Sequence, residues 1–216
     1  MKSKKETIKI VDLLKKEYPD AKTSLDYSNA FELLIATILS AQCTDKRVNM
    51  VTPKLFEKFP DAKKMSKANL DELEDLVKST GFYKNKALSL KKSSQRIVDE
   101  FNGRVPDNMD DLLSLQGVAR KTANVVLGNA FNKKIGIVVD THVKRLSNRI
   151  GFSANSNPDK IEKDLIELVE KKDWTVFSHL MIYHGRAVCD AKKPRCDECL
   201  LNKDCDNAFK FPRFIT

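Results

Sequence analysis

The chain has 216 residues, of which 41% are hydrophobic and 32% charged, so it can form a packed core and is not expected to be disordered. Its 39 Lys and Arg residues outnumber its 30 Asp and Glu residues, which gives a net charge of +9. A surplus of this size favours a polyanionic partner, with nucleic acid ahead of a membrane surface. The basic N-terminus is not followed by the apolar stretch of a secretion signal, and no uncharged apolar run is long enough to cross a membrane. We therefore expect a cytoplasmic protein in a reducing compartment.

The spacing of apolar residues predicts one helix after another. Two expected helix starts carry Asn followed three residues later by Glu, at Asn29 and Glu32 and again at Asn69 and Glu72, a pattern typical of a capping box. The helices that we expect cover residues 4–18, 31–41, 70–80, 84–101, 109–115, 120–131, a segment that starts near 141, 159–172 and 174–184.

Residues 133–140, which read KKIGIVVD, are the one run with a β-like composition. A single short run without a partner cannot form a sheet, so we expect an extended segment between helices. Asn157 followed by Pro158 is typical of an N-cap and a first-turn proline for the next helix. The predicted fold class is therefore all-α. Internal repeats and Gly/Ser linkers are absent from the sequence, so composition does not reveal a domain boundary.

Four of the five cysteines lie within residues 189–205, here called the cysteine segment, with the spacing Cys-x6-Cys-x2-Cys-x5-Cys. In a reducing compartment, clustered cysteines bind metal more often than they form disulfides. Four thiolates hold either zinc or an iron–sulfur cluster. Structural zinc usually pairs two short Cys-x2-Cys units, and only one is present, so the spacing favours a 4Fe-4S cluster without excluding zinc. The four residues are Cys189, Cys196, Cys199 and Cys205, whereas Cys43 is interpreted as a small buried residue.

The first interval of the cysteine segment contains Lys192, Lys193 and Arg195. A loop tied at both ends to a metal group would present these cations in fixed positions. Such cations suit a phosphate backbone, because little conformational entropy is lost on contact. An ordinary solvated lysine patch is the alternative, since lysines are abundant in this chain.

Residues 110–128 predict two helices joined by a tight turn at Gly117, the second helix starting near Arg120. Such a turn can direct backbone N–H groups at a phosphate, aided by the positive N-terminus of the second helix. A plain αα-hairpin is the common alternative. Lys121 lies in the first turn of the second helix, where the helix dipole repels a cation. With burial, that repulsion would favour a neutral amine able to form a Schiff base, although most lysines in such a chain are solvated.

Asp140 follows an apolar run in the stretch VVDTHVKR, residues 138–145, so we expect it at the edge of buried structure. Asp140 or Thr141 can cap the following helix. A carboxylate near a cleft can also deprotonate a lysine or stabilise positive charge on a sugar. The sequence pattern leaves both roles open.

The segments FELLIATILSAQCTD, LQGVARKTANVVL, VVDTHVKR and HGRAVC occur in one order before the last three cysteines. Over residues 5–206 this combination closely resembles the endonuclease III family of helix-hairpin-helix glycosylases. The resemblance implies a bifunctional DNA glycosylase and abasic-site lyase that removes oxidised pyrimidines and cleaves 3′ of the lesion by β-elimination. It implies Lys121 as the nucleophile that forms the Schiff base, Asp140 as the catalytic carboxylate and the four clustered cysteines as ligands of a 4Fe-4S cluster.

The resemblance also implies two helical domains that flank a DNA-binding cleft. Residues 23–134 would form a six-helix barrel with the hairpin, and residues 1–22 and 135–216 would carry the terminal helices and the iron–sulfur loop. The expected partner is double-stranded DNA with damaged pyrimidines or abasic sites, bound by a monomer away from membranes, at the nucleoid if the source is bacterial. The implied DNA contacts are Gln42, which would fill the gap left by the extruded base, Phe82 as an apolar wedge, Gly117, Ala119, Thr122, Lys192, Lys193 and Arg195.

Two positions depart from the hairpin that is usual in the family, Leu-Pro-Gly-Val-Gly. Gln116 replaces the proline and so removes a preset φ, and Ala119 replaces the second glycine. The added methyl group would resist a positive φ where the backbone meets phosphate. We expect these changes to affect the phosphate affinity of the hairpin.

Two other functions fit parts of the pattern. A monofunctional mismatch glycosylase resembles this chain but lacks the lysine, so Lys121 argues against it. A non-enzymatic DNA-binding or electron-carrying iron–sulfur protein is the alternative from another class, and activity on thymine-glycol DNA would exclude it.

Overall fold

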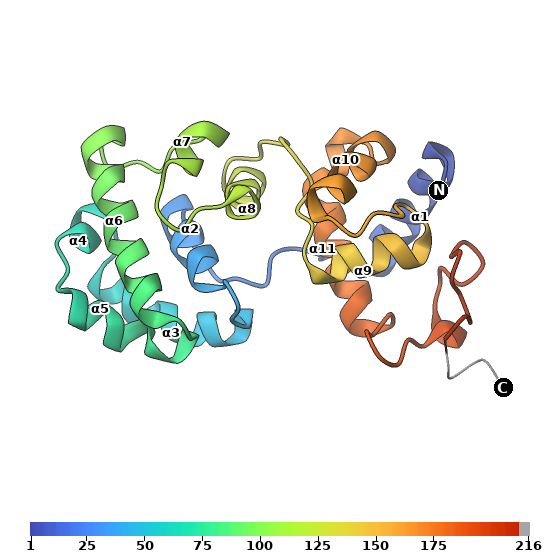
Figure 1. Ribbon diagram of the computed structural model, residues 1–216, viewed down its shortest axis with the longest axis horizontal. Helices are drawn as coiled ribbons and strands as arrows, with labels where there is room; N and C mark the ends of the chain where they lie inside the picture. The colour runs from blue at the N-terminus through green and yellow to red at the C-terminus, as the bar shows by residue number, and fades with distance from the viewer. Residues whose placement is uncertain (212–216) are drawn as a thin grey trace. The chain divides into compact units, whose positions relative to one another are not determined.

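The computed structural model describes residues 1–211, and every regular element within these residues is helical, which confirms the all-α prediction (Figure 1). None of the helices in this part of the chain is long and apolar enough to cross a membrane. The α-helices are α1 (Lys4–Glu17), α2 (Ala30–Leu39), α3 (Asp45–Lys58), α4 (Ala62–Ser66), α5 (Leu70–Val77), α6 (Tyr83–Phe101), α7 (Met109–Leu113), α8 (Arg120–Ala130), α9 (Thr141–Ile150), α10 (Pro158–Leu168) and α11 (Trp174–Ala187). Three short 3₁₀ turns accompany them, η1 (Lys78–Thr80), η2 (Lys171–Asp173) and η3 (Cys196–Glu198).

Asparagine caps begin α2 and α10 as the sequence predicts. The Asn29 side chain accepts a hydrogen bond from the Glu32 N–H (3.0 Å), but the Glu32 carboxylate accepts from the N–H of Ser28 (2.6 Å). The reciprocal half of the capping box therefore closes one residue earlier than expected. Asn157 caps α10 through two backbone N–H groups, and Pro158 occupies the first helical position.

At α5 only half of the expected capping box forms. Asn69 accepts from the Asp71 N–H (2.8 Å), whereas Glu72 pairs with Lys58 at the end of α3. The helix α3 itself was not predicted, because Pro53 lies in its interior and proline usually ends or kinks a helix.

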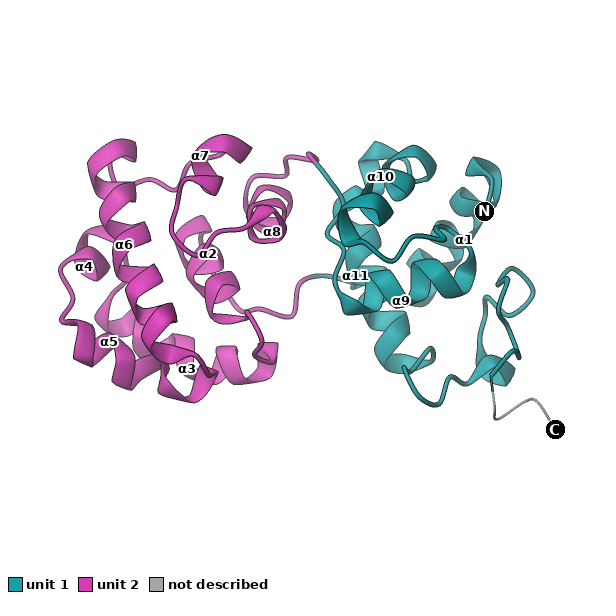
Figure 2. Ribbon diagram, in the orientation of Figure 1, with its two compact units in different colours: residues 1–22, 136–216 teal, residues 23–135 magenta. Residues whose placement is uncertain are grey.

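The chain divides into two compact units (Figure 2). Unit 2 comprises Thr23–Ile135 and therefore holds α2 to α8. Its α2 is apolar on nearly every side and buried, as expected for a helix surrounded by others, and it packs against α3, α6 and α8. The long helix α6 packs in turn against α4 and α5. This arrangement fixes the starts of α6 and α8 on one common core.

Unit 1 comprises Met1–Lys22 and Gly136–Thr216. The N-terminal helix α1 packs against α10 and α11, and α9 also contacts both of these helices. Phe152 and Phe177 meet edge to face in the core, with ring centroids 5.8 Å apart. The predicted extended segment has no regular structure, and the Ser178 hydroxyl holds it by donating to the Val138 carbonyl (2.9 Å).

Candidate functional site

The predicted hairpin is present, with a tight turn between α7 and α8. Gly117 has a φ of 81°, and a Cβ at this position would lie 2.9 Å from the Cβ of Ser89. Glycine is therefore required both by the left-handed backbone and by the space around it. Ala119 has a φ of −95° and a ψ of 170°, an extended conformation that alanine adopts freely. The expected resistance of Ala119 to a positive φ does not arise.

Two side chains of α6 hold the hairpin turn, in which Gln116 stands in place of a proline. The Ser93 hydroxyl donates to the Gln116 carbonyl (2.5 Å), and Ser93 itself is buried. The Arg96 guanidinium donates to the Ser114 carbonyl (2.9 Å). These bonds restrict the turn where the fixed φ of proline is missing.

The start of α8 has no side-chain cap, because the methyl group of Ala119 cannot accept a hydrogen bond. The first backbone N–H groups of the helix can therefore meet an anion such as a phosphate. Thr122 is half-buried in this first turn, but Lys121 is exposed. The burial expected for Lys121 is thus wrong for the chain without DNA, and bound DNA would have to exclude water from its amine.

Asp140 is the N-cap of α9, where its carboxylate accepts a hydrogen bond from the Val143 N–H (2.8 Å). The residue is half-buried, as expected for a position that follows an apolar run. The cap holds the carboxylate in one orientation at the start of the helix. Asp140 belongs to unit 1 and Lys121 to unit 2.

Gln42 and Phe82 share an unusual backbone conformation that the sequence did not indicate. Their φ angles are 53° and 49°, in the left-handed region, and both residues are exposed. The Phe82 side chain keeps 65% of its surface in solvent, which is high for a large apolar residue. A residue other than glycine in this region costs about 1–2 kcal/mol, and such strain collects at functional sites. Asn102, Asn132 and Phe209 also have positive φ angles, so this conformation supports the two predicted contacts but does not by itself identify them.

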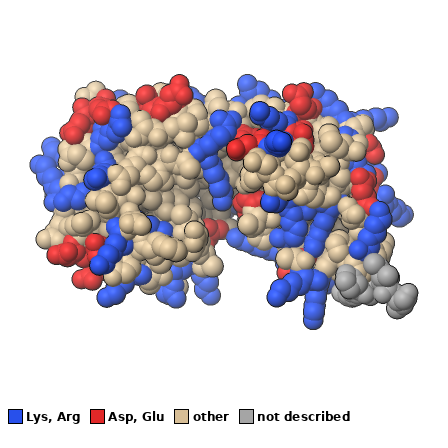
Figure 3. All heavy atoms as spheres, viewed as in Figure 1, with Lys and Arg blue, Asp and Glu red and all other residues tan. Residues whose placement is uncertain are grey.

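Hydrogen bonds within the basic loop, residues 190–195, hold its backbone, whereas the sequence prediction attributed its rigidity to a metal group at both ends. The Asp190 carboxylate accepts hydrogen bonds from the N–H groups of Lys192 (2.8 Å) and Lys193 (3.0 Å), and Pro194 is buried beneath them. Both lysine side chains are exposed. On the face drawn in Figure 3, Lys and Arg side chains gather around the C-terminal end of α11 and the loop that follows it.

Arg195 faces back onto its own loop. Its guanidinium donates to the Ala187 carbonyl at the end of α11 and pairs with Glu198 (2.8 Å). An exposed ion pair of this kind contributes about 0–1 kcal/mol, so DNA can displace it at little cost. In the free chain Arg195 stabilises the loop.

The four clustered cysteines are free thiols that line one pocket of unit 1, and Cys43, which was expected to be buried, is half-buried in unit 2. Among residues 1–211, no three His, Cys, Asp or Glu side chains converge closely enough to hold one metal ion. Four thiolates are the ligand set of an iron–sulfur cluster and of a structural zinc ion alike, so the lining of this pocket fits either group. Burial raises the pKa of Cys199 to about 11 and also raises that of Cys205, so ligation would release protons.

A second shell of hydrogen bonds surrounds these thiols. The His184 Nε2 lies 3.4 Å from the Cys199 sulfur, and its Nδ1 lies 3.1 Å from the Tyr18 hydroxyl. Burial lowers the pKa of His184 to about 4 and raises the pKa of Tyr18 to about 12, so both groups are neutral near pH 7. If Tyr18 donates to Nδ1, the proton of the imidazole sits on Nε2 and points at the sulfur. Such outer partners orient the ligands of a metal site.

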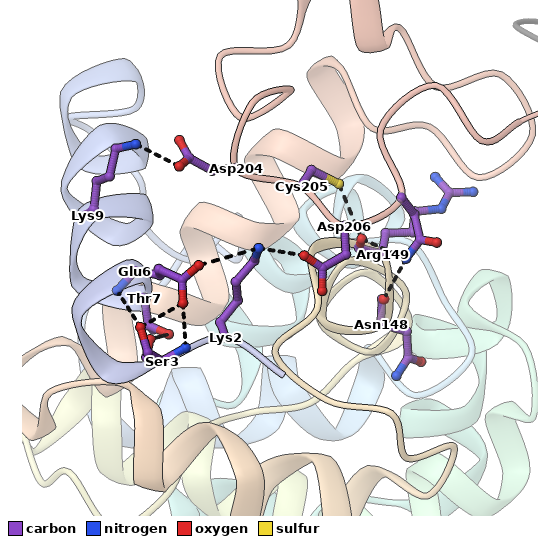
Figure 4. A network of polar contacts seen from close by, with 11 residues as sticks. Lys2, Ser3, Glu6, Thr7, Lys9, Asn148, Arg149, Asp204, Cys205 and Asp206 are labelled. Atoms are coloured by element: carbon purple, nitrogen blue, oxygen red, sulfur yellow. Dashed lines mark hydrogen bonds and ion pairs between the residues drawn. The ribbon is translucent and has the colours of Figure 1, made fainter.

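Figure 4 shows how the end of the cysteine segment is tied to the rest of unit 1. Lys9 on α1 pairs with Asp204 (2.6 Å), and Lys2 pairs with Asp206 (2.5 Å). The Cys205 thiol donates to the Arg149 carbonyl (3.2 Å) on α9. The cysteine segment is therefore held from both sides, by the first helix of the chain and by α9.

Comparisons with known proteins agree on the family. The family model described as HhH-GPD superfamily base excision DNA repair protein matches residues 35–171. The chain is 53% identical over 209 residues to Endonuclease III of Synechocystis sp., an alignment that covers 96% of this chain and 95% of the relative.

Two solved structures are similar along almost the whole chain. One is a non-covalent Endonuclease III–DNA complex, with 42% identity, a TM-score of 0.91 and coverage of 97% of this chain and 98% of that one. The other is a trapped Endonuclease III–DNA covalent intermediate with an estranged adenine, also with 42% identity and a TM-score of 0.91, covering 97% of this chain and 99% of that one. The chain therefore belongs to the endonuclease III family, within the HhH-GPD superfamily of base excision DNA repair proteins.

Proposed function

We propose that the protein is a DNA N-glycosylase for oxidised pyrimidines and an abasic-site lyase, with Lys121 as its nucleophile. The observation that carries this proposal is the exposed amine of Lys121 at the uncapped start of α8, directly after a turn that requires Gly117. The likeness to an enzyme trapped in a covalent bond with DNA supports chemistry of this kind. The substrate is double-stranded DNA, bound by a monomer.

The covalent step begins when the neutral amine of Lys121 attacks C1′ of the deoxyribose and the damaged base departs. The carboxylate of Asp140 stabilises the positive charge that develops on the sugar, or accepts the proton that the lysine must lose. The sugar ring then opens as the C1′–O4′ bond breaks, and a proton goes to the ring oxygen, so that a protonated imine forms between C1′ and Lys121. This imine acidifies the C2′ proton, and removal of that proton eliminates the 3′ phosphate and breaks the strand. Water then releases the lysine from the sugar fragment. Asp140 can do this work while it caps α9, because a carboxylate has more than one acceptor site.

The target base must leave the duplex before this chemistry can occur, at a cost of a few kcal/mol. Gln42 and Phe82 would occupy the space that the base leaves, and their exposed, strained positions support this role. Backbone N–H groups near Ala119 and Thr122 would bind one phosphate. Lys192 and Lys193 would bind others, joined by Arg195 once its pair with Glu198 opens.

We also propose that Cys189, Cys196, Cys199 and Cys205 hold a 4Fe-4S cluster, since the four thiols line one pocket and their spacing departs from the two short Cys-x2-Cys units that are usual for structural zinc. When bound, the cluster would supply a structural anchor at both ends of the basic loop. Unit 1 would then be the cluster domain, and unit 2 the helical barrel that carries the hairpin. Iron and acid-labile sulfide in a 4:4 ratio per chain is the expected analysis, and one zinc per chain would contradict it.

Borohydride trapping tests the nucleophile. Wild type on a duplex with thymine glycol should give cleaved product and a covalent adduct, and Lys121→Ala should give neither while it still binds DNA. Alanine favours helix, so α8 should persist in this variant. The matched control is Lys63→Ala, an exposed lysine on α4, which should behave as wild type. An adduct from Lys121→Ala would reject the assignment, and a wild type without activity on this duplex would reject the enzyme.

A further inference from the structure

Lys86 is a buried lysine in a chain whose other lysines are largely exposed. Only 6% of its surface reaches solvent, and it lies in the first turns of α6. Its ammonium donates to the Leu39 carbonyl (2.8 Å) and to the Thr80 carbonyl (2.7 Å). Burying an ammonium is costly unless its donors are satisfied, and here the acceptors are main-chain carbonyls. An apolar residue at this buried position would avoid that cost, so the presence of the cation needs an explanation.

Each of these carbonyls lies shortly before a residue with a left-handed backbone, Gln42 in one case and Phe82 in the other. Leu39 is the last residue of α2, three positions before Gln42, and Thr80 is the last residue of η1, two positions before Phe82. The backbone N–H of Lys86 also donates to the Phe82 carbonyl (3.1 Å). One residue thus connects both segments, although they lie about 40 positions apart in the sequence.

The ammonium suits this place electrostatically. The Leu39 carbonyl is at the C-terminal, negative end of α2, where a cation is stabilised. Charge-assisted hydrogen bonds of this kind are stronger than neutral ones. An apolar side chain of equal length would fill the space and leave both carbonyls without a partner.

We propose that Lys86 is a positioning residue that fixes the distance between the Gln42 loop, residues 40–44, and the Phe82 loop, residues 78–82, so that both side chains enter one gap in the duplex together. This inference rests on the proposed function, because it requires Gln42 and Phe82 to act on DNA. It assigns to the α6 lysine a share in base extrusion and none in the covalent step.

The inference is tested with Lys86→Met, which keeps the length of the side chain and removes the donors. Two substrates separate extrusion from chemistry: a duplex with thymine glycol opposite adenine, and a single strand with a preformed abasic site, which has no base to extrude. The ratio of the two single-turnover rates, duplex over single strand, should fall at least about 10-fold, the equivalent of one lost charged hydrogen bond. The rise in fluorescence of 2-aminopurine placed opposite the lesion, which reports unstacking, should fall with it.

The control is Lys92→Met, an exposed lysine on the same helix that undergoes the same change of charge. Its rate ratio should match that of wild type. In a Gln42→Ala, Phe82→Ala background, Lys86→Met should no longer change the ratio, because the residues through which it acts are gone. If Lys86→Met does not fold, Lys86→Gln replaces it, since the shorter amide can reach one carbonyl only and should also lower the ratio.

Equal losses on both substrates would show a structural role only and would overturn the inference, as would an unchanged ratio or an effect that persists in the double-alanine background. All three results leave the proposed function standing, because wild type remains active. A wild type that is inactive on both substrates would refute the proposed function and this assignment with it.

Discussion

Replacing Gly117 with alanine should destabilise the protein by about 3 kcal/mol, through two effects that can be separated. The first is the φ of 81°, which costs an alanine about 1–2 kcal/mol. The second is the contact of 2.9 Å between the new Cβ and the Cβ of Ser89, well inside the optimum of about 3.5–4.0 Å. Because a Cβ is attached directly to the backbone, Ser89 cannot rotate it away, and overpacking of this kind typically costs about 1–3 kcal/mol.

The assay is thermal unfolding followed by far-UV circular dichroism. For a chain of this size, a loss of about 3 kcal/mol lowers Tm by roughly 6–12 °C. Ser89→Gly should cost about 1 kcal/mol by itself, because glycine weakens a helix interior. In the double variant the steric part disappears and the φ part remains. The double variant should therefore be about 1.5 kcal/mol more stable than the sum of the single effects predicts.

Two results would refute this reasoning. A Gly117→Ala variant within about 0.5 kcal/mol of wild type, the range of ordinary surface substitutions, would mean that the turn does not need glycine. Strict additivity in the double variant would mean that Ser89 does not limit the space. Binding of undamaged duplex, measured on the same variants, should weaken with Gly117→Ala, since the turn also aims backbone N–H groups at phosphate.

Two further predictions concern unit 1. Asp140→Asn should keep the α9 cap and hence Tm, because Asn and Asp cap equally well, but its rate of single-turnover base release should fall by about 10²–10⁴-fold. Asp140→Ala should show the same loss of activity and should also lose about 1 kcal/mol of stability. Near-normal turnover in the Asn variant would remove Asp140 from the mechanism. Joint replacement of Lys192 and Lys193 by alanine should reduce the slope of log affinity against log salt by up to about 2. The same replacement of Lys63 and Lys64, an exposed pair on α4, should leave the slope unchanged. An unaltered slope in the first variant would mean that the basic loop does not contact phosphate.

The helix starts were predictable because their causes are local. Asn29 and Asn157 bond to backbone groups two or three residues away, and that geometry needs no knowledge of the fold. The cysteine spacing was similarly informative, since the four clustered cysteines line one pocket. Where a tertiary contact decided the outcome, the pattern was misleading: Glu72 bonds to Lys58 of α3 and not to its own helix start.

The exposed strain at Gln42 and Phe82 could not be predicted, because neither residue favours a left-handed backbone. Lys86 bonds to the main chain shortly before each of these residues, and this tertiary contact is not visible in the sequence. In the sequence Lys86 is one of several lysines in a periodic basic helix, and nothing in the spacing separates it from Lys92. Its role became visible only when its two acceptors were known.

Two α-helices that begin beside proposed DNA contacts have no side-chain cap, α6 after Phe82 and α8 after Ala119, whereas α3, which follows the Gln42 loop, is capped by Thr44. In the described chain α11 is the remaining case, and there the N-cap carboxylate of Asp173 pairs with Lys15 (2.7 Å). A missing cap costs about 1 kcal/mol, and a phosphate can supply the absent acceptor.

Capping and DNA binding should therefore compete at the start of α8. Ala119 already has the extended backbone that a serine cap needs, so Ala119→Ser should raise the stability by about 1 kcal/mol, a gain in Tm of roughly 2–4 °C. The same hydroxyl would occupy an N–H group that otherwise meets phosphate, so the affinity for duplex should fall several-fold at fixed salt, by fluorescence anisotropy. A more stable variant with unchanged affinity would show that DNA does not use this helix start, and the hairpin would then serve only to place Lys121.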